Sequence, residues 1–255
     1  MTLRDVFEPL RARAELAFVP YQTAGFPTLA DSIANLRTLA DCGADILEVG
    51  VPFSDPMADG PTIQACSQVA LENGVTLAAT LAALRDLDVP APRVMMSYLN
   101  PLLAYGRARL LADMQAAGVR GLIVPDLPLE ESDAWLADAR ARDISIVFLV
   151  APTSTDERIA RVAERTDGFI YAVSLTGTTG ARRHLPAGLP AFLERIRGIT
   201  DKPIVVGFGI GAAEHVRALR GKADGVVVAS RIIDAIRRGE DWPQLARNLK
   251  AATRA

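Results

Sequence analysis

Two carboxylates stand in the sequence where folding alone would not place them. Glu48 lies inside the apolar run Ala-Asp-Ile-Leu-Glu-Val-Gly at positions 44–50, and Asp59 ends the Pro-rich stretch that follows it. A buried strand normally excludes a carboxylate, because its charge must leave water. Two carboxylates in different environments can divide acid and base roles between them. We therefore predict that Glu48 and Asp59 are catalytic.

Structural explanations stay open for these residues at this point. Glu48 could be a structural group paired with an arginine across the core. Asp55 and Asp59 could form turns, or cap the helix expected over residues 62–73.

Other catalytic residue types are scarce. Lys202 and Lys222 come before the apolar runs 203–208 and 225–229, and His184 and His215 are the only histidines. In a parallel barrel the N-terminal ends of the strands serve stability rather than chemistry, so we expect no Schiff-base lysine. Two isolated histidines do not suggest a metal site either. We therefore expect chemistry from carboxylates, tyrosines, hydroxyls and backbone N–H groups, with no metal.

The elements that must position these groups recur along the chain. Apolar segments rich in β-branched residues alternate with helical patterns, and no Ser/Pro-rich linker divides them. The alternation predicts a (β/α)8 TIM barrel as a single domain over residues 1–255, with an extra N-terminal helix over 3–14 and a C-terminal helix over 242–254. The alternative, a doubly wound open sheet, needs a Gly-rich fingerprint that segment 23–27 lacks. The expected strands are 17–21, 45–50, 93–97, 121–124, 145–150, 168–174, 203–208 and 225–230, and the helices between them include 29–42, 107–117, 130–142, 156–164, 191–199 and 212–220.

Composition limits the function classes. The net charge is −2 and hydrophobic residues make up 50% of the chain, so we expect a sizeable core and no nucleic-acid partner. No apolar run is long enough to span a bilayer, and the N-terminus lacks the order of a secretion signal, so a cytoplasmic location is expected. Cys42 and Cys66 suggest neither a disulfide nor a zinc pair.

Loops after the strands should form the chemical face of such a barrel. Segment 175–189 is long and rich in glycine and hydroxyls, which is typical of a lid. Glycines of segment 207–211 and Ser230 can offer backbone N–H groups to a phosphate, although these glycines could also form only tight turns. Tyr98, Tyr171 and Phe208 end three strands and favour a flat apolar pocket, although each alone could belong to the core. We infer a phosphorylated substrate with an aromatic portion.

Taken together, these stretches resemble the tryptophan synthase alpha chain family. The resemblance runs in order over nearly the whole chain, and segment 47–64 is its most specific part. The matching segments are 18–27, 47–64, 98–101, 125–128, 171–180 and 207–210.

The resemblance implies a lyase that cleaves indole-3-glycerol phosphate to indole and glyceraldehyde 3-phosphate in tryptophan biosynthesis. It implies that Glu48 protonates C3 of the indole and then takes the proton of the side-chain hydroxyl, while Asp59 binds the indole N–H. Tyr171 would position the substrate and Thr179 would hold Asp59. Phosphate would lie at Gly180, Gly209, Ala229 and Ser230, and the indole pocket would be lined by Tyr21, Ile63, Met96, Tyr98, Ile123 and Phe208.

The resemblance also implies a partner. A beta chain that carries pyridoxal phosphate would receive the indole in an α2β2 assembly, so no cofactor is expected in this chain. The docking surfaces would be segments 52–56 and 100–103 and the lid, which partner binding would close. Two alternatives remain at this point: another phosphosugar isomerase or synthase, and a non-catalytic regulatory subunit.

The sequence departs from the family pattern at two positions. Ala229 stands where the family has glycine, so its methyl group is expected to narrow the phosphate site and to exclude an easy positive φ. Tyr21 stands where phenylalanine is common, and its hydroxyl needs a partner.

Overall fold

Parallel strands close the chain into a barrel. The computed structural model describes residues 2–173, 185–207 and 209–254. Within these residues nine strands are hydrogen-bonded in the order β5-β4-β3-β2-β1-β9-β8-β7-β6. They are β1 (Ala17–Thr23), β2 (Leu47–Gly50), β3 (Arg93–Met96), β4 (Val119–Ile123), β5 (Ser145–Val147), β6 (Leu149–Val150), β7 (Ile170–Val173), β8 (Ile204–Gly207) and β9 (Gly225–Val228).

β5 and β6 are two halves of one predicted strand. β5 pairs with β4 and β6 pairs with β7, so together they occupy the fifth of eight positions around the ring. Between them, the Phe148 N–H donates to the Thr166 hydroxyl at 3.2 Å instead of to a neighbouring strand. The predicted (β/α)8 barrel is confirmed, and the predicted strand over 145–150 is interrupted at Phe148.

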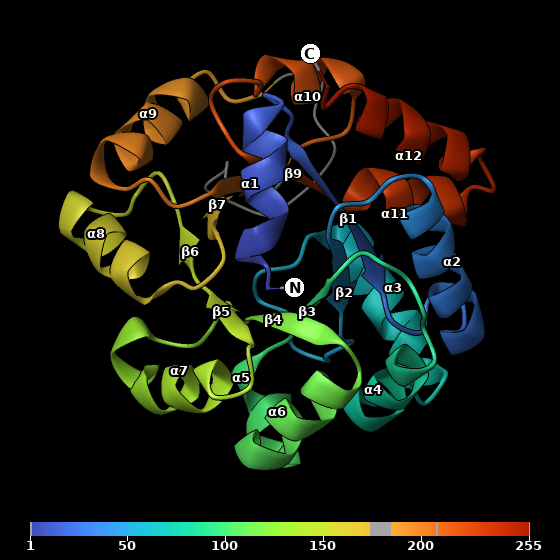
Figure 1. Cartoon of the computed structure of the whole chain (residues 1–255). Coiled ribbons are helices and arrows are strands. Elements are labelled where there is room, and N and C mark those ends of the chain that lie inside the picture. Colours follow the sequence, from blue (N-terminus) through green and yellow to red (C-terminus); the bar gives the residue numbers. More distant parts are fainter. Residues whose placement is uncertain (1, 174–184, 208, 255) are drawn as a thin grey trace.

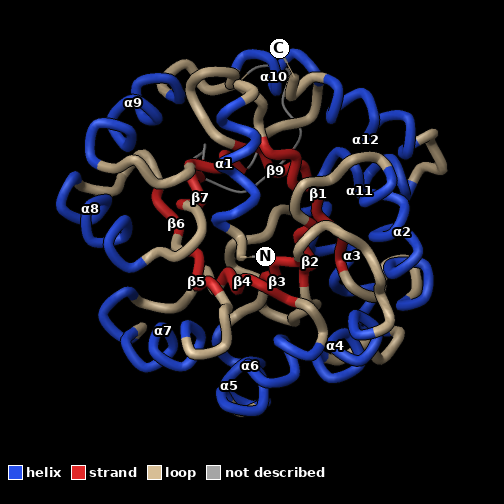
Figure 2. The backbone as a smooth tube through the Cα atoms, in the orientation of Figure 1, coloured by secondary structure: helices blue, strands red, loops and turns tan. Residues whose placement is uncertain are grey.

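Helices surround this ring, as Figures 1 and 2 show. Thr28 and Thr155 cap α2 and α8, since each hydroxyl accepts the N–H of the residue three positions later. The helices are α1 (Arg4–Ala12), α2 (Leu29–Asp41), α3 (Pro61–Glu72), α4 (Leu77–Arg85), α5 (Leu99–Tyr105), α6 (Arg107–Ala116), α7 (Asp133–Arg140), α8 (Asp156–Arg165), α9 (Leu189–Ile199), α10 (Ala213–Ala218), α11 (Ser230–Arg237) and α12 (Trp242–Ala251).

The predicted helix over 130–142 is wrong in its first turn. A 3-10 turn over Leu129–Glu131 precedes α7, which begins only at Asp133. The side chain of Ser132 donates to the Leu129 carbonyl at 2.7 Å, and a serine bonded to its own backbone in this way competes with helix continuation.

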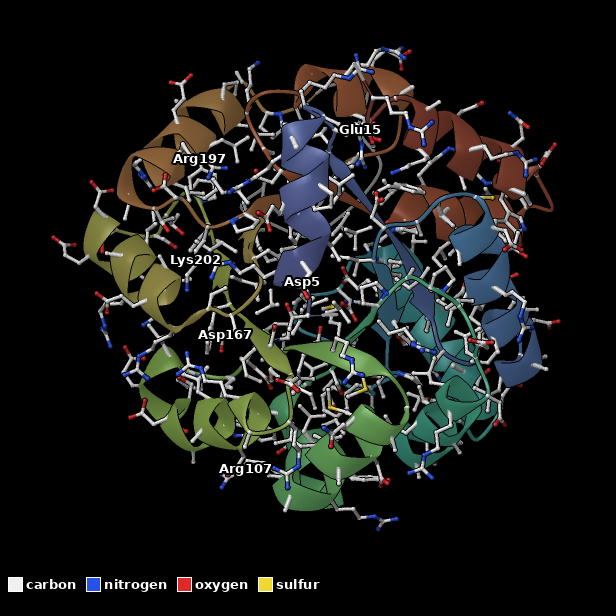
Figure 3. The ribbon with its side chains drawn as sticks, in the orientation of Figure 1. Asp5, Glu15, Arg107, Asp167, Arg197 and Lys202 are labelled. Carbon is white, nitrogen blue, oxygen red and sulfur yellow. The ribbon has the colours of Figure 1, made fainter. Side chains whose placement is uncertain are left out.

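Helix α1, the predicted N-terminal helix, covers the N-terminal end of the barrel (Figure 1). Val6, Phe7 and Leu10 of α1, with Leu3 before it, pack in one cluster with side chains inside the strand ring. Burying each such side chain contributes about 1.5–3 kcal/mol, more than an exposed ion pair. Charged residues around this end, including Asp5, Asp167 and Lys202, are labelled in Figure 3. Apolar packing therefore closes this end, and the opposite end is left for chemistry.

Within the described residues, no helix combines the length and the apolar character that crossing a membrane would need.

Candidate active site

Glu48 lies in the middle of β2, beside Tyr21 of β1 and Val94 of β3 in the strand register. Its side chain is 1% exposed, and its Oε2 atom has no hydrogen-bond partner among the described residues. Burial, and secondarily the nearby Asp59 carboxylate, raises the pKa of Glu48 to about 8. No arginine pairs with it in the described structure, so the structural explanation for Glu48 loses its support.

Asp59 sits in the segment between β2 and α3, and it too is nearly buried. Burial raises the pKa of Asp59 to about 6, while a hydrogen bond from the Tyr98 hydroxyl lowers it. The same Tyr98 oxygen accepts the Ala58 N–H at 3.0 Å, which holds the segment before Asp59 in place. Gly60, not Asp59, is the N-cap residue of α3, and no side chain caps that helix. The capping explanation for Asp59 is therefore wrong.

The two carboxyl groups are in different protonation states near neutral pH. With a pKa near 8, Glu48 keeps its proton, whereas Asp59, with a pKa near 6, is ionised. The site thus offers one buried acid that can donate a proton and one carboxylate that can stabilise a developing positive charge.

Two tyrosines flank Glu48 inside the barrel, and each lies over a glycine of the next strand. A Cβ atom at Gly50 would come within 1.8 Å of the Tyr21 hydroxyl oxygen, and one at Gly207 within 2.2 Å of the Tyr171 ring. The Tyr21 hydroxyl accepts a hydrogen bond from Thr23 at 3.4 Å, so the extra hydroxyl expected at position 21 has its partner. These two close approaches make room for aromatic side chains beside the buried acid.

One cavity brings most of the predicted site residues together. It has a volume of about 40 Å³. Among the predicted residues, Ile123 is buried in the barrel interior and Tyr98 hydrogen-bonds Asp59, and neither lines this cavity. The cavity is lined by the predicted residues Tyr21, Glu48, Asp59, Ile63, Met96, Tyr171, Gly209, Ala229 and Ser230.

The predicted phosphate end of this cavity is described in part. Gly209 has a φ of 78°, which favours glycine, and Ser230 begins α11. Ala229 has a φ of −107°, so its backbone needs no positive φ, contrary to the expected difficulty at this position. Thr179, Gly180, Phe208 and the predicted lid lie outside the described residues.

Four lining residues were not predicted from the sequence: Gly60, Ile210, Val227 and Arg231. Gly60, Ile210 and Val227 could have been predicted, because each lies beside or near a predicted residue in the sequence. Arg231 is different, because it brings a charge. The sequence gives no local signal for it, because only the structure shows that a helix begins at Ser230. An arginine at that position sits at the positive end of the helix dipole, where cations are disfavoured.

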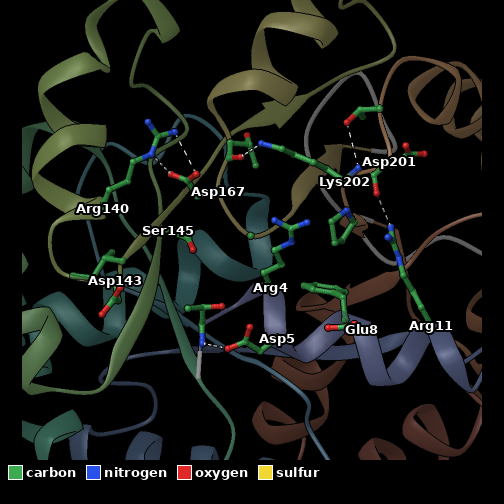
Figure 4. Close-up of a pocket in the computed structure, with 17 residues that line it drawn as sticks. Arg4, Asp5, Glu8, Arg11, Arg140, Asp143, Ser145, Asp167, Asp201 and Lys202 are labelled. Carbon is green, nitrogen blue, oxygen red and sulfur yellow. Dashed lines mark hydrogen bonds and ion pairs between the residues drawn. The ribbon is translucent and has the colours of Figure 1, made fainter.

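A larger cavity, of about 790 Å³, lies at the opposite end of the barrel beside α1 (Figure 4). Its cations are largely engaged with groups around them. Arg140 Nε contacts Asp167 at 2.8 Å, Arg11 Nη2 donates to the Asp201 carbonyl at 3.0 Å, and Lys202 Nζ donates to the Thr166 carbonyl. Basic side chains near helix C-termini typically make such contacts. The large volume of this cavity therefore does not by itself identify it as the active site.

Comparison with known proteins decides the family. The family model of the tryptophan synthase alpha chain matches residues 7–254. The chain belongs to the tryptophan synthase alpha chain family. A curated alpha chain from Roseiflexus castenholzii is 52% identical over 96% of this chain and 95% of its own length. One from Synechocystis is 45% identical over 91% of this chain and 89% of its own length.

Solved structures show the same fold. Mycobacterium tuberculosis tryptophan synthase aligns with a TM-score of 0.94 at 38% identity, covering 99% of this chain and 98% of the other. The Legionella pneumophila alpha chain aligns with a TM-score of 0.88 at 30% identity, covering 99% and 97%.

No group of three or more metal-ligating side chains occurs within the described part of the chain.

Proposed function

We propose that this lyase, which cleaves indole-3-glycerol phosphate to indole and glyceraldehyde 3-phosphate, uses Glu48 and Asp59 as its catalytic residues. The observation that carries the proposal is the burial of Glu48, whose Oε2 atom has no hydrogen-bond partner among the described residues, next to a second carboxylate of lower pKa. A carboxylic acid kept neutral near pH 7 can donate a proton that an exposed glutamate would already have lost.

Glu48 acts first as an acid and then as a base. Its proton is transferred to C3 of the indole ring, which leaves a cation centred on the ring nitrogen. The Glu48 carboxylate then takes the proton of the hydroxyl on the adjoining side-chain carbon. That carbon becomes the aldehyde of glyceraldehyde 3-phosphate as its bond to C3 breaks, and the bonding electrons return to the indole ring. Glu48 regains its proton, and no charge is left over.

Asp59 stabilises the cation between these two steps. An ionised carboxylate that accepts the indole N–H favours the charged ring over the neutral one, and in a buried site this attraction is much stronger than in water. The hydrogen bond from Tyr98 keeps Asp59 ionised near neutral pH, because it lowers the Asp59 pKa against the effect of burial. Tyr98 is therefore a positioning residue for Asp59.

The remaining predicted residues hold the substrate. Tyr21, Ile63, Met96 and Tyr171 would surround the indole ring, and backbone N–H groups at Gly209 and Ser230 would bind the phosphate at the start of α11. We keep Thr179, Gly180, Phe208, Ala229 and Ile123 in the proposed site as the resemblance assigns them. The cavity of about 40 Å³ holds only a few water molecules, so substrate binding must widen it.

The proposed steps need no cofactor in this chain. The indole ring accepts the bonding electrons once C3 is protonated, so neither a Schiff base nor a metal is required. Pyridoxal phosphate would belong to the partner beta chain, which consumes the indole.

We further propose that the beta chain docks at the open end of the barrel in an α2β2 assembly. Among the described residues, the exposed large hydrophobic side chains are Met57, at 77% exposure, and Leu103, at 55%. Exposed apolar side chains of this kind are typical of interfaces. Phe53 stacks on Tyr98 at 5.2 Å between ring centroids, and Tyr98 precedes the helix that carries Leu103. This surface therefore adjoins Asp59.

The sheet order, which runs through all the strands of the described chain, supports a single domain over residues 1–255. We also propose a cytoplasmic location.

A direct assay tests the proposed function. The purified chain is incubated with indole-3-glycerol phosphate, and indole and glyceraldehyde 3-phosphate are measured as equimolar products. An isomerase of a related phosphosugar would consume a substrate without releasing indole. A regulatory subunit would bind the beta chain and release no indole at all.

A further inference from the structure

Arg231 is a cation at the positive end of a helix. It follows Ser230, the first residue of α11, and the first turn of this helix holds no acidic residue. The unpaired N–H groups of a helix N-terminus carry a partial positive charge, which repels a cation and attracts an anion. A residue whose charge is unfavourable for its local structure, and which lies next to an active site, is expected to contact a ligand there.

Arg231 also lines the catalytic cavity, together with Gly209 and Ser230. Among the described lining residues it is the only basic one, whereas Glu48 and Asp59 are acidic. A substrate phosphate carries about two negative charges near neutral pH and must enter beside these carboxyl groups. Backbone N–H groups supply only partial charges, so a full positive charge at this end would offset the repulsion.

The present partner of Arg231 is replaceable. Its Nη2 contacts Glu240 Oε2 at 2.7 Å, and both side chains are about one-third exposed. Ion pairs at such exposure contribute little to stability, so a doubly charged anion can compete with Glu240. Glu240 Oε1 also lies 3.8 Å from Arg238 Nη1, so Glu240 keeps a cation when Arg231 leaves.

We propose that Arg231 exchanges Glu240 for the phosphate of the substrate and so determines the preference of this site for phosphorylated ligands. The guanidinium can bind two phosphate oxygens at once, which adds a geometric requirement to the charge. The proposal rests on the proposed function of the cavity. It also gives a role beside Ala229, whose methyl group is expected to narrow the phosphate site: a side-chain cation would supplement the backbone N–H groups there.

Binding of glycerol 3-phosphate by calorimetry tests the exchange without catalysis. Arg231→Ala is expected to weaken binding at least about tenfold, because it removes a charge-assisted bidentate contact. Glu240→Gln is expected to tighten binding about two- to fivefold, because it releases Arg231 from competition. Arg238→Ala is the matched control: it removes the other cation of Glu240, does not line the cavity, and should change binding by less than about twofold.

Kinetics with indole-3-glycerol phosphate provide the second readout. For Arg231→Ala the loss should appear as a raised KM with a much smaller change in kcat, and Arg231→Lys should recover part of it. A structural role for Arg231 would instead lower the melting temperature and leave KM near that of the parent.

Either of two outcomes overturns the proposal: glycerol 3-phosphate binding to Arg231→Ala within about twofold of the parent, or no tightening in Glu240→Gln. If the parent chain releases no indole but binds glycerol 3-phosphate with this dependence on Arg231, the proposed function fails while the anion site stands.

Discussion

The pKa values of Glu48 and Asp59 lie on opposite sides of neutrality, and this separation sets the pH range in which the site can work. Glu48 must be protonated, so activity should fall as the pH rises through about 8; Asp59 must be ionised, so activity should fall below about 6. Measured from about pH 5 to pH 10, kcat/KM should therefore be bell-shaped.

Asp59→Asn should move the alkaline limb of this pH profile to lower pH, because it removes a like charge that raises the Glu48 pKa. An alkaline limb that stays in place would contradict this coupling.

Glu48→Gln separates chemistry from stability. We expect kcat to fall at least about 100-fold, the usual range for a general acid and base. Stability should rise instead. The folded-state pKa is raised from 4.5 to about 8, so the parent loses stability as the pH rises across this window, by about 1.4 kcal/mol per unit, and glutamine does not. Denaturant unfolding of both proteins at several pH values measures this difference.

Glu8→Gln is the control for that experiment. Glu8 is an exposed carboxylate on α1, at the far end of the barrel from the site. It should leave kcat unchanged. A Glu48→Gln protein with activity within threefold of the parent would exclude Glu48 from the mechanism.

At the residue scale, the sequence predicts the carboxylates well and the charges around them poorly. Glu48 stands out in the sequence because a buried apolar strand normally excludes a carboxylate. Arg231 does not stand out, because arginines occur throughout the helices of this chain and only the fold shows which of them reaches the cavity. Ile123, which was expected in the indole pocket, belongs to the core cluster inside the barrel and is paired in register with Met96, which lines the cavity.

At the scale of elements, α12 is tied to the barrel by one nearly buried ion pair. Lys250 Nζ contacts Asp45 Oδ2 at 2.6 Å, and the same oxygen accepts the Phe18 N–H at 2.7 Å. Lys250→Met should destabilise the fold by about 2–4 kcal/mol, because it leaves a shielded carboxylate without its cation. Adding Asp45→Asn should restore part of that loss. Denaturant unfolding of the single and double variants measures the coupling, and strictly additive losses would exclude it.

The backbone N–H groups after β8 and β9, at Gly209 and Ser230, are proposed to bind the phosphate and offer a second test at this scale. Gly209→Val should weaken glycerol 3-phosphate binding strongly, since a branched side chain blocks the anion and a φ of 78° strains it. Ala229→Gly should tighten binding if the methyl group crowds the phosphate. Calorimetry on both variants gives the answer, and unchanged affinity in both would mean that the phosphate binds elsewhere.

Element boundaries could be predicted where local signals are strong. The helices expected over 29–42 and 156–164 begin where predicted, because Thr28 and Thr155 cap α2 and α8 and a hydroxyl N-cap is a local chemical feature. The break at Phe148 depends on Thr166, eighteen residues away, which no local pattern contains. Segment 100–103 was expected only as a docking surface, and the structure makes it part of α5, with Pro101 in its first turn, where proline is tolerated.

At the scale of the whole molecule, α1 closes one end of the barrel, and the exposed large hydrophobic side chains of the described residues, Met57 and Leu103, lie at the other end. We expect Met57→Ser and Leu103→Ser to weaken binding of a cognate beta chain, each by about tenfold, because they remove apolar area from the proposed interface. Titration calorimetry with the beta chain measures this. Glu8→Ala, at the closed end, is the control and should bind as the parent does. Equal affinity for all of these variants would place the interface elsewhere.

The two tyrosine–glycine contacts described beside Glu48 limit the order in which this active site can change during evolution. Any side chain at Gly50 meets the hydroxyl of Tyr21, and any side chain at Gly207 meets the ring of Tyr171. A mutation at either glycine is therefore harmful while its tyrosine is present, and becomes acceptable only after a smaller residue has replaced that tyrosine. The effect of a substitution at the glycine therefore depends on whether the tyrosine has already been replaced. New substrate pockets in this barrel are accordingly reached through the tyrosine first and the glycine second.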